Sequence, residues 1–173
     1  MTGIHGPDSG NRERLTFLIR LYEKDILRIC YLYLHDIEQA KDAAQETFLK
    51  AYTHFDSLKD ATKEKYWLTK IAVNTCRDYL RSSWAVHINR YVRPEDLRIA
   101  AEQPDETKTA LTAAVMNLPQ KLMEAVILRY VQGYDIAETA EILRITPSAV
   151  SRRCQKARII LKNELEGSED YNE

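Results

Sequence analysis

A run of basic residues lies near the C-terminus of the chain. The segment 145–162, ITPSAVSRRCQKARIILK, carries five lysines and arginines and no acidic residue, although the 173-residue chain has a formal net charge of -1. Cationic side chains at this density can bind the phosphates of a nucleic acid, and arginine can also donate two hydrogen bonds to the edge of a base. The solvated face of an ordinary helix has the same composition, so the surrounding residues must distinguish the two interpretations.

The spacing of apolar residues places these cations on a helix. Its apolar face repeats every three or four positions, at Val150, Cys154, Ala157 and Leu161. Thr146 can cap free N–H groups and Pro147 has none to satisfy, so the helix is predicted to begin near Pro147. Residues 135–143, DIAETAEIL, predict a short helix before it, and only Arg144 and Ile145 intervene before Thr146. Two short helices joined by so tight a turn form a helix-turn-helix.

The second helix of such a unit enters the major groove of duplex DNA, where its exposed polar side chains reach base edges. The residues predicted to read bases are Ser148, Ser151, Arg152, Gln155 and Lys156. Those predicted to contact phosphates, which fix the register without reading sequence, are Arg153, Arg158 and Lys162. The turn carries Arg144 where many such units carry glycine, and a left-handed conformation there would cost about 1 kcal/mol.

The distribution of glycine predicts the fold class of the whole chain. No glycine lies between residues 11 and 132, so this long stretch lacks the turn glycines that a sheet protein would need. Helical periodicity recurs over residues 14–36, 37–58 and 63–84, and the first of these is apolar around much of its circumference. In the second, the residues predicted to point inward are Ala40, Ala44, Phe48, Leu49 and Tyr52. The chain is therefore predicted to be all-α.

Interruptions of this periodicity predict two small helical domains joined by a flexible linker. Residues 13–84 form the first domain, a helical bundle, and residues 109–165 form the second, which contains the helix-turn-helix. Residues 85–108 between them hold two prolines and several acidic side chains, and are predicted to be a linker in which one short helix could form. Residues 166–173 form an acidic tail, and fraying or disorder is predicted beyond Leu165.

Composition argues against several other classes of protein. No apolar run approaches the length of a membrane span and the N-terminal segment lacks the apolar core of a signal peptide, so the protein is expected to be cytoplasmic. Cys30, Cys76 and Cys154 are widely spaced, without a CxxC pattern, so we expect buried free thiols, no metal and no cofactor. The four histidines lie apart, without an HExxH motif, a P-loop or a nucleophile elbow nearby, which argues against an enzyme with a small-molecule substrate.

Three segments, taken in order, carry a family resemblance. QETFLKAY (45–52), YWLTKIAVNTCRDYLR (66–81) and residues 118–158, which contain the helix-turn-helix, resemble segments of the extracytoplasmic-function sigma factors of bacterial RNA polymerase. The resemblance covers roughly residues 13–82 and 109–162. It implies that the chain binds core RNA polymerase and directs promoter-specific transcription initiation. The C-terminal helix would recognise the −35 element as duplex, and the N-terminal domain would melt and capture the −10 element.

The resemblance also implies roles within the N-terminal domain. The segment 42–52 matches the part that docks on the clamp helices of the largest polymerase subunit, and its implied docking residues are Asp42, Gln45, Glu46 and Leu49. The segment 63–81 matches the part that captures unpaired −10 bases, which need a cationic groove and base pockets. Its implied residues are Lys63, Lys65, Lys70, Asn74, Arg77 and Arg81. Trp67 and Tyr79 fit either a core or a base-stacking role, and Asp78 is expected to orient a basic neighbour.

Other interpretations of the same segments stay open. The acidic face of segment 42–52 also fits an ordinary solvated helix. A stand-alone transcriptional regulator would use the same helix-turn-helix, but it would not need the QETFLKAY or WLTKIAVN pattern. Members of the resembled family are usually held inactive by an anti-sigma factor, often a membrane protein, so the resemblance adds such a partner to core polymerase and promoter DNA.

Overall fold

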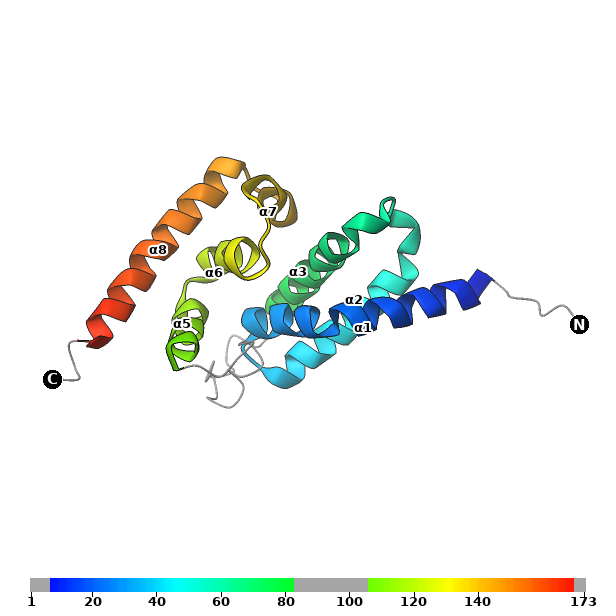
Figure 1. Ribbon diagram of the computed structural model, residues 1–173, viewed down its shortest axis with the longest axis horizontal. Coiled ribbons are helices and arrows are strands. Elements are labelled where there is room, and N and C mark those ends of the chain that lie inside the picture. The colour runs from blue at the N-terminus through cyan, green and yellow to red at the C-terminus, as the bar shows by residue number, and fades with distance from the viewer. Residues whose placement is uncertain (1–6, 83–105, 170–173) are drawn as a thin grey trace, which may run out of the picture. The chain divides into compact units, whose positions relative to one another are not determined.

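The regular elements of the described chain are all helical. The computed structural model describes residues 7–82 and 106–169, and no β-strand occurs within these ranges (Figure 1). The chain divides into two compact units, Met1–Asn89 and Arg90–Glu173. The predicted fold class, all-α with two small helical domains, is confirmed. Most of the predicted linker lies outside the described residues, and only its last three residues fall in a described helix.

Three helices form the N-terminal unit. They are α1 (Pro7–Leu34), α2 (Ile37–Thr53) and α3 (Glu64–Ser82), and each packs against the other two (Figure 1). All of residues 29–34 are buried, so the end of α1 is covered around its whole circumference, as its apolar composition predicts. The buried alanines of α2 let the neighbouring helices approach closely; they are Ala40, Ala43, Ala44 and Ala51.

Polar caps define the loops on either side of α2. His35 adopts a left-handed φ of 58°, and the Asp36 carboxylate then accepts a hydrogen bond from the Gln39 N–H at 2.9 Å. After α2 the chain forms two short 3-10 helices, η1 (Phe55–Ser57) and η2 (Ala61–Lys63). Asp60 caps η2 by accepting hydrogen bonds from the hydroxyl and the N–H of Thr62, at 2.6 and 2.9 Å, and these bonds lower the pKa of Asp60.

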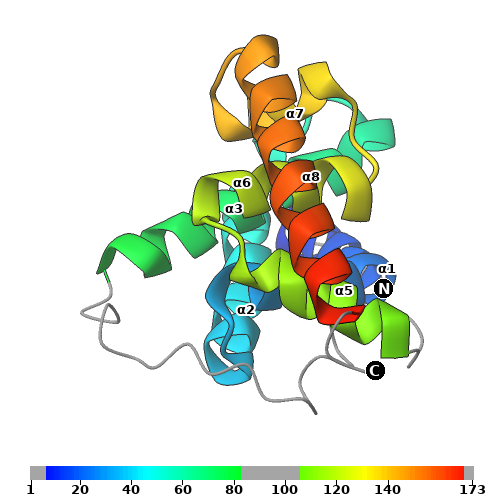
Figure 2. The same ribbon diagram turned by 90° about the vertical axis from the view of Figure 1, so that its left-hand side faces the viewer.

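The C-terminal unit is built around a buried helical segment. Its elements are α5 (Glu106–Asn117), α6 (Gln120–Val126), the π-helix η4 (Ile127–Val131), α7 (Ile136–Leu143) and α8 (Pro147–Glu169). Residues 122–128, which run from α6 into η4, are all buried. The helix α8 packs against α5, α6 and α7 (Figure 2). The hydrogen bond from the Gln132 N–H to the Ile127 carbonyl, at 2.9 Å, closes the π-turn.

The helix-turn-helix forms as predicted from α7, a tight turn and the start of α8. Asp135 and Glu138 make a reciprocal capping box at the start of α7. Arg144 ends this helix at φ 55° and ψ 48°, in the left-handed region. Thr146 caps α8 by accepting a hydrogen bond from the Ala149 N–H at 3.2 Å. Val150, in the first turn of α8, is fully buried.

One prediction about this fold is wrong. Leu49 points to solvent, with 63% of its surface exposed, although it was predicted to point inward. Successive residues of a helix lie about 100° apart, so Thr47 and Phe48 lie on the buried side and Leu49 lies outside it. The helix α8 extends to Glu169, and the fraying predicted beyond Leu165 stays a prediction. An ion pair at 3.7 Å between Lys162 and Glu166, one turn apart, stabilises this extension.

The described residues contain neither a membrane span nor a metal-binding cluster. Within residues 7–82 and 106–169 no helix is long and apolar enough to cross a membrane. The same ranges hold no group of three or more His, Cys, Asp or Glu side chains suited to a metal ion. Cys30, Cys76 and Cys154 are buried and carry free thiols, in agreement with the sequence-based expectation.

The left-handed Arg144 leads to a prediction about stability. We expect Arg144→Gly to stabilise the C-terminal unit by about 1 kcal/mol, because glycine adopts positive φ without a Cβ penalty. Urea unfolding of the full chain, followed by circular dichroism, measures the change. Arg144→Ala is the control, since alanine removes the charge and keeps the Cβ. An equal gain from both variants would show that the charge, and not the backbone conformation, sets the cost.

Candidate nucleic-acid interface

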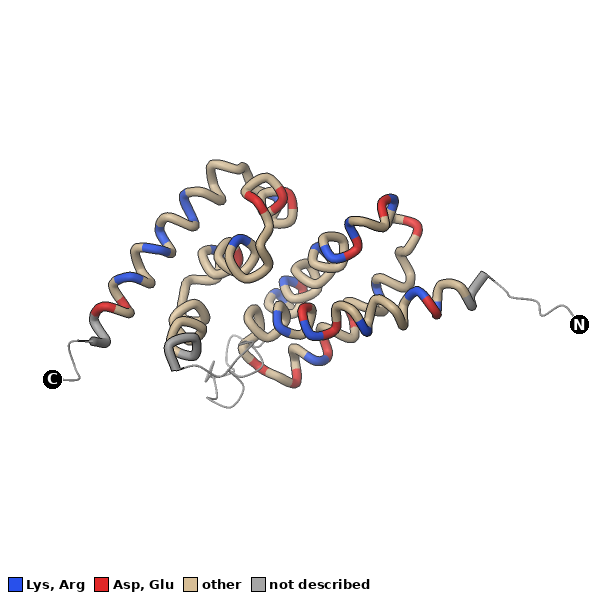
Figure 3. Tube along the Cα trace, viewed as in Figure 1, with Lys and Arg blue, Asp and Glu red and all other residues tan. Residues whose placement is uncertain are grey.

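One face of α8 presents polar and basic side chains to solvent. The exposed residues are Ser148, Arg152, Gln155, Lys156 and Arg158, and Ser151 is half-buried beside them. The opposite side carries the buried residues Val150, Cys154 and Ala157. Figure 3 shows lysines and arginines at repeated positions along α8, with acidic residues only near its C-terminal end. The side chains predicted to read bases therefore share one accessible face of a helix, the arrangement needed to enter a major groove.

Arg153 lies differently from the other cations of α8. Only 21% of its side chain is exposed, and its Nη1 is 3.9 Å from the Oε2 of Glu124 on α6. The same nitrogen donates a hydrogen bond to the backbone carbonyl of Lys121 at 3.4 Å. The guanidinium of Arg153, which was predicted from the sequence to contact DNA phosphates, therefore points into the domain. Sequence reasoning missed Glu124 as its partner, although an acidic residue within the apolar stretch 122–128 was an available signal.

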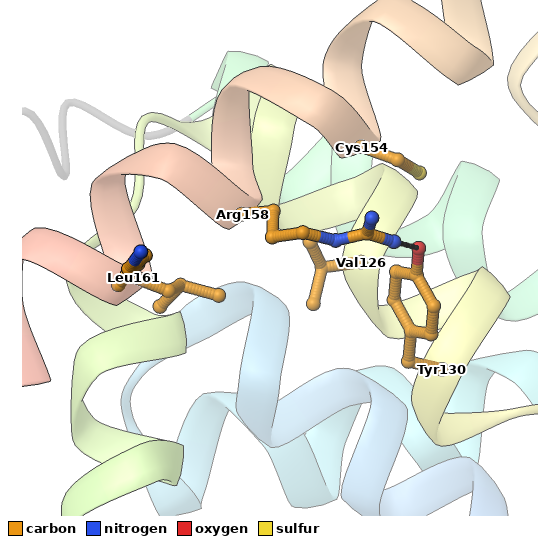
Figure 4. Close-up of a pocket in the computed structure, with 6 residues that line it drawn as sticks. Val126, Tyr130, Cys154, Arg158 and Leu161 are labelled. Atoms are coloured by element: carbon orange, nitrogen blue, oxygen red, sulfur yellow. Dashed lines mark hydrogen bonds between the residues drawn. The ribbon is translucent and has the colours of Figure 1, made fainter.

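Arg158 borders a hollow on the C-terminal unit. The hollow has a volume of about 300 Å³ and is lined by Val126, Tyr130, Cys154, Arg158, Leu161 and Lys162 (Figure 4). Arg158 reaches across it and donates a hydrogen bond to the Tyr130 hydroxyl at 3.1 Å (Figure 4). Burial raises the pKa of the Cys154 thiol, and the positive charges of Arg129 and Arg158 oppose that rise. Arg158 is thus exposed but already oriented by a neighbour.

A second candidate surface lies on α2. Asp42, Gln45 and Leu49 are exposed and Glu46 is half-buried, and their spacing places all four on one helix face. The Oε1 of Glu46 is 2.7 Å from the Nζ of Lys50. Burial, followed by the negative charges of Glu46 and Asp42, raises the pKa of Tyr79 on α3. The face therefore combines negative charge with an exposed apolar side chain, and Glu46 also connects it to α3.

The predicted cations of the N-terminal unit lie along η2 and α3. Lys63 is exposed, and Lys65, Lys70, Asn74 and Arg77 are half-buried. Lys65 pairs with Asp25 of α1 at 2.9 Å, and the Nζ of Lys70 lies 5.5 Å from the centre of the Tyr66 ring. Arg81 is exposed and forms an ion pair with Asp78. This pair matches the orienting role expected for Asp78, whose other carboxylate oxygen lies 3.7 Å from the Nζ of Lys50.

An aromatic cluster holds the loop that precedes α3. The rings of Phe55 and Trp67 stack with their centres 6.0 Å apart, and the guanidinium of Arg14 lies 5.1 Å from the centre of the Phe55 ring. The Trp67 Nε1 donates a hydrogen bond to the Ser57 hydroxyl at 2.9 Å. Trp67 is half-buried within these contacts, which favours the structural role over base stacking.

Comparison with known families assigns both units. Residues 18–86 match Sigma-70 region 2, and residues 108–161 match Sigma-70 region 4. The sigma factor SigM of Mycobacterium tuberculosis, an extracytoplasmic-function (ECF) RNA polymerase sigma factor, is 32% identical over 152 residues, which cover 87% of this chain and 76% of SigM. The chain belongs to the ECF sigma factors.

Further relatives of this sigma factor agree in length and fold. SigW of Bacillus subtilis, also an ECF sigma factor, is 25% identical over 90% of this chain and 91% of its own. Among solved structures, RpoE from Bartonella quintana, crystallised with the anti-sigma factor NepR, superposes with a TM-score of 0.74 at 21% identity, over 89% of this chain and 98% of RpoE. CnrH, in complex with the cytosolic domain of CnrY, gives a TM-score of 0.66 at 21% identity over 92% of each chain. Both structures share the fold of this sigma factor.

The family regions coincide with the surfaces described above. The sigma factor's region 2 match contains the acidic face of α2 and the cations of α3, and its region 4 match contains the exposed face of α8. The structure therefore gathers each predicted set of side chains within one unit, with Arg153 as the member that points elsewhere.

Proposed function

We propose that this sigma factor joins core RNA polymerase and directs it to promoters by reading the −35 element with α8. The observation that carries the proposal is the exposed face of α8, where Arg152, Gln155 and Lys156 project from the second helix of a helix-turn-helix. Arg152 has the geometry to donate two hydrogen bonds to guanine, and Gln155 can pair with adenine. Ser148, Ser151 and Arg158 border this face and supply contacts to bases and phosphates.

The N-terminal unit then supplies strand opening. Capture of unpaired −10 bases needs a positive track for the backbone, which Lys63, Lys65, Lys70, Arg77 and Arg81 provide along η2 and α3. Asn74, which is half-buried on α3 between Lys70 and Arg77, offers an amide to a base edge. The ion pairs of Lys65 with Asp25 and of Arg81 with Asp78 restrict these two cations before DNA arrives.

The acidic face of α2 is the docking surface for core polymerase in this proposal. Asp42 and Glu46 suit a basic partner surface, and Leu49 gives that interface an apolar centre. The partner assigned to this face is the pair of clamp helices of the largest subunit. The domain bounds that we propose are residues 13–84 and 109–165, with 85–108 as the linker and 166–173 as the acidic tail.

Regulation and location complete the proposal. RpoE was solved with the anti-sigma factor NepR, and CnrH was solved with the cytosolic domain of CnrY. We propose an anti-sigma partner for this chain as well. We also propose a cytoplasmic location, where promoters and polymerase are found, and a role as a transcription factor without enzymatic activity of its own.

Reconstituted transcription tests the proposal. The purified chain is expected to co-elute with bacterial core RNA polymerase and to make it initiate at defined starts on genomic promoter fragments. Core polymerase without the chain is the control and should give no such transcripts. Tight binding to a palindromic duplex without any association with core polymerase would instead establish a stand-alone regulator.

Substitution of a base-reading residue should change sequence preference. Arg152→Ala is expected to cost about 1–3 kcal/mol on a promoter with the preferred base and much less on one without it, because a bidentate contact to a single base is lost. Competition binding across duplexes that vary one upstream base pair at a time gives this pattern. A uniform loss over all duplexes would make Arg152 a phosphate contact.

A further inference from the structure

A buried acidic residue lies behind the recognition helix. Glu124 of α6 is 3% exposed and belongs to the stretch 122–128, all of whose residues are buried. A carboxylate in such a place is stable only with charged or hydrogen-bonding partners. Arg153 of α8 supplies an opposite charge, with its Nη1 3.9 Å from the Glu124 Oε2, which is near the outer limit for an ion pair and too long for a hydrogen bond.

Arg153 connects α8 to α6 at two points. Besides the ion pair with Glu124, its Nη1 donates a hydrogen bond to the Lys121 carbonyl at 3.4 Å. Lys121 and Glu124 are three residues apart, so they are neighbours along one face of α6. The Nη1 atom of Arg153 is thereby held between a backbone group and a carboxylate of α6, so a turn of α8 about its axis would break these contacts.

The remaining contacts between α8 and the domain are of two kinds, polar and apolar. Five residues after Arg153, Arg158 donates a hydrogen bond to the Tyr130 hydroxyl at 3.1 Å. Val150, Cys154 and Ala157 face inward and are buried, but apolar contacts have little directional preference. A rotation of α8 by about 20° would move a side-chain tip roughly 8 Å from its axis by about 3 Å, which is enough to break a bidentate contact to a base. Correct base reading therefore needs a group that fixes this rotation.

We infer that Glu124 is a positioning residue for promoter recognition, which acts through Arg153 to set the rotation of α8. With Arg153 held inward, its neighbour Arg152 lies about 100° around the helix and points to solvent, where it is exposed. The inference rests on the proposed function, in which α8 reads the −35 element. It also gives Arg153 a role inside the domain in place of the phosphate contact predicted from the sequence.

The test measures discrimination between DNA sequences. The full chain, assembled with bacterial core polymerase, is titrated with a duplex that the wild-type assembly has selected from a randomised pool, and with a mixed-sequence duplex of the same length. Glu124→Gln and Arg153→Met are each expected to lower the ratio of the two affinities roughly tenfold, the loss of about one good base contact. The double variant should lower it no further than either single variant, because both remove the same link.

The salt dependence separates positioning from a phosphate contact. In Arg153→Met the slope of log affinity against log salt should remain that of the wild type, since no phosphate contact is lost. Lys162→Met is the matched control, because Lys162 was also predicted to contact phosphates and its ion pair with Glu166 lies within α8. Loss of a phosphate contact there should reduce the slope by about 0.9 and weaken both duplexes equally. The same reduction in Arg153→Met would overturn the inference.

Two further results would separate a failure of this inference from a failure of the proposed function. Variants that melt at a lower temperature yet keep the wild-type affinity ratio would give the ion pair a purely stabilising role and overturn the inference alone. A wild-type assembly that does not distinguish the two duplexes would overturn the proposed function, and the inference with it. Circular dichroism of each variant confirms that the affinities belong to folded protein.

Discussion

Leu49→Asp is expected to abolish the association of the protein with core RNA polymerase and to leave its helical fold intact. Leu49 is 63% exposed on α2, next to Asp42, Gln45 and Glu46, so it needs no burial within the monomer. In the complex it would lie in the desolvated centre of the interface, where a carboxylate would lose its hydration without gaining a partner. We expect affinity to fall at least 100-fold, about 3 kcal/mol, in a titration of labelled protein with core polymerase.

Leu21→Asp is the matched control for this experiment. Leu21 is an equally large apolar residue on α1 and is 53% exposed, but it does not belong to the proposed docking face. Its substitution should leave the affinity for polymerase within twofold of the wild type. An unchanged melting temperature would confirm that the variant is folded. If both substitutions weaken polymerase binding equally, the docking surface extends to α1 or lies elsewhere. Glu46 is a less informative site, because its charge also holds Lys50 at 2.7 Å.

Val150→Asp is expected to unfold the C-terminal unit and to leave the N-terminal unit folded. Val150 of α8 is fully buried, and an aspartate there would be an uncompensated buried charge. Such a change costs roughly 3–5 kcal/mol, most of the stability of so small a domain. The N-terminal unit keeps its own core of α1, α2 and α3. We expect loss of part of the helical circular dichroism, rapid proteolysis of the C-terminal half, and loss of −35 recognition with polymerase docking retained.

Ile159→Asp controls for the chemistry of that substitution. Ile159 is also β-branched and also lies on α8, but it is 62% exposed, so the new carboxylate stays hydrated. The free energy of unfolding of this variant should match that of the wild type within about 0.5 kcal/mol. If Val150→Asp instead removes the helical signal of both units in one cooperative transition, the units do not fold independently.

Most of the fold could be predicted because its local signals agree with one another. Thr146 and Pro147 mark the start of α8, and the structure places the first residue of that helix at Pro147. The apolar face at Val150, Cys154 and Ala157 is buried as predicted, and Arg144 adopts the left-handed conformation that a tight turn needs. Each of these features depends on residues close in sequence, where capping and periodicity carry enough information.

The features that could not be predicted depend on contacts between distant residues. Nothing near Arg153 in the sequence distinguishes it from Arg152, and only the packing of α6 against α8 brings Glu124 to one of them. Leu49 follows Phe48 in a helix with a wide apolar face, and the edge of that face is set by where α1 and α3 lie. The π-turn at Ile127–Val131 has no local signal that we recognised. For the candidate site, residue types indicated the chemistry, but orientation came only from tertiary structure.

The unbroken course of α8 to Glu169 has a consequence for how the protein finds DNA. Its lysines and arginines lie in the part from Arg152 to Lys162, and Glu164 and Glu166 follow on the same helix. This order of charges reinforces the backbone dipole of the helix, whose positive end is also N-terminal. In the field of a polyanion the unit would experience a torque that turns the N-terminal half of α8 toward the duplex before contact. Diffusional encounters would then be biased toward the orientation in which base reading begins, and this bias would weaken as salt screens the field.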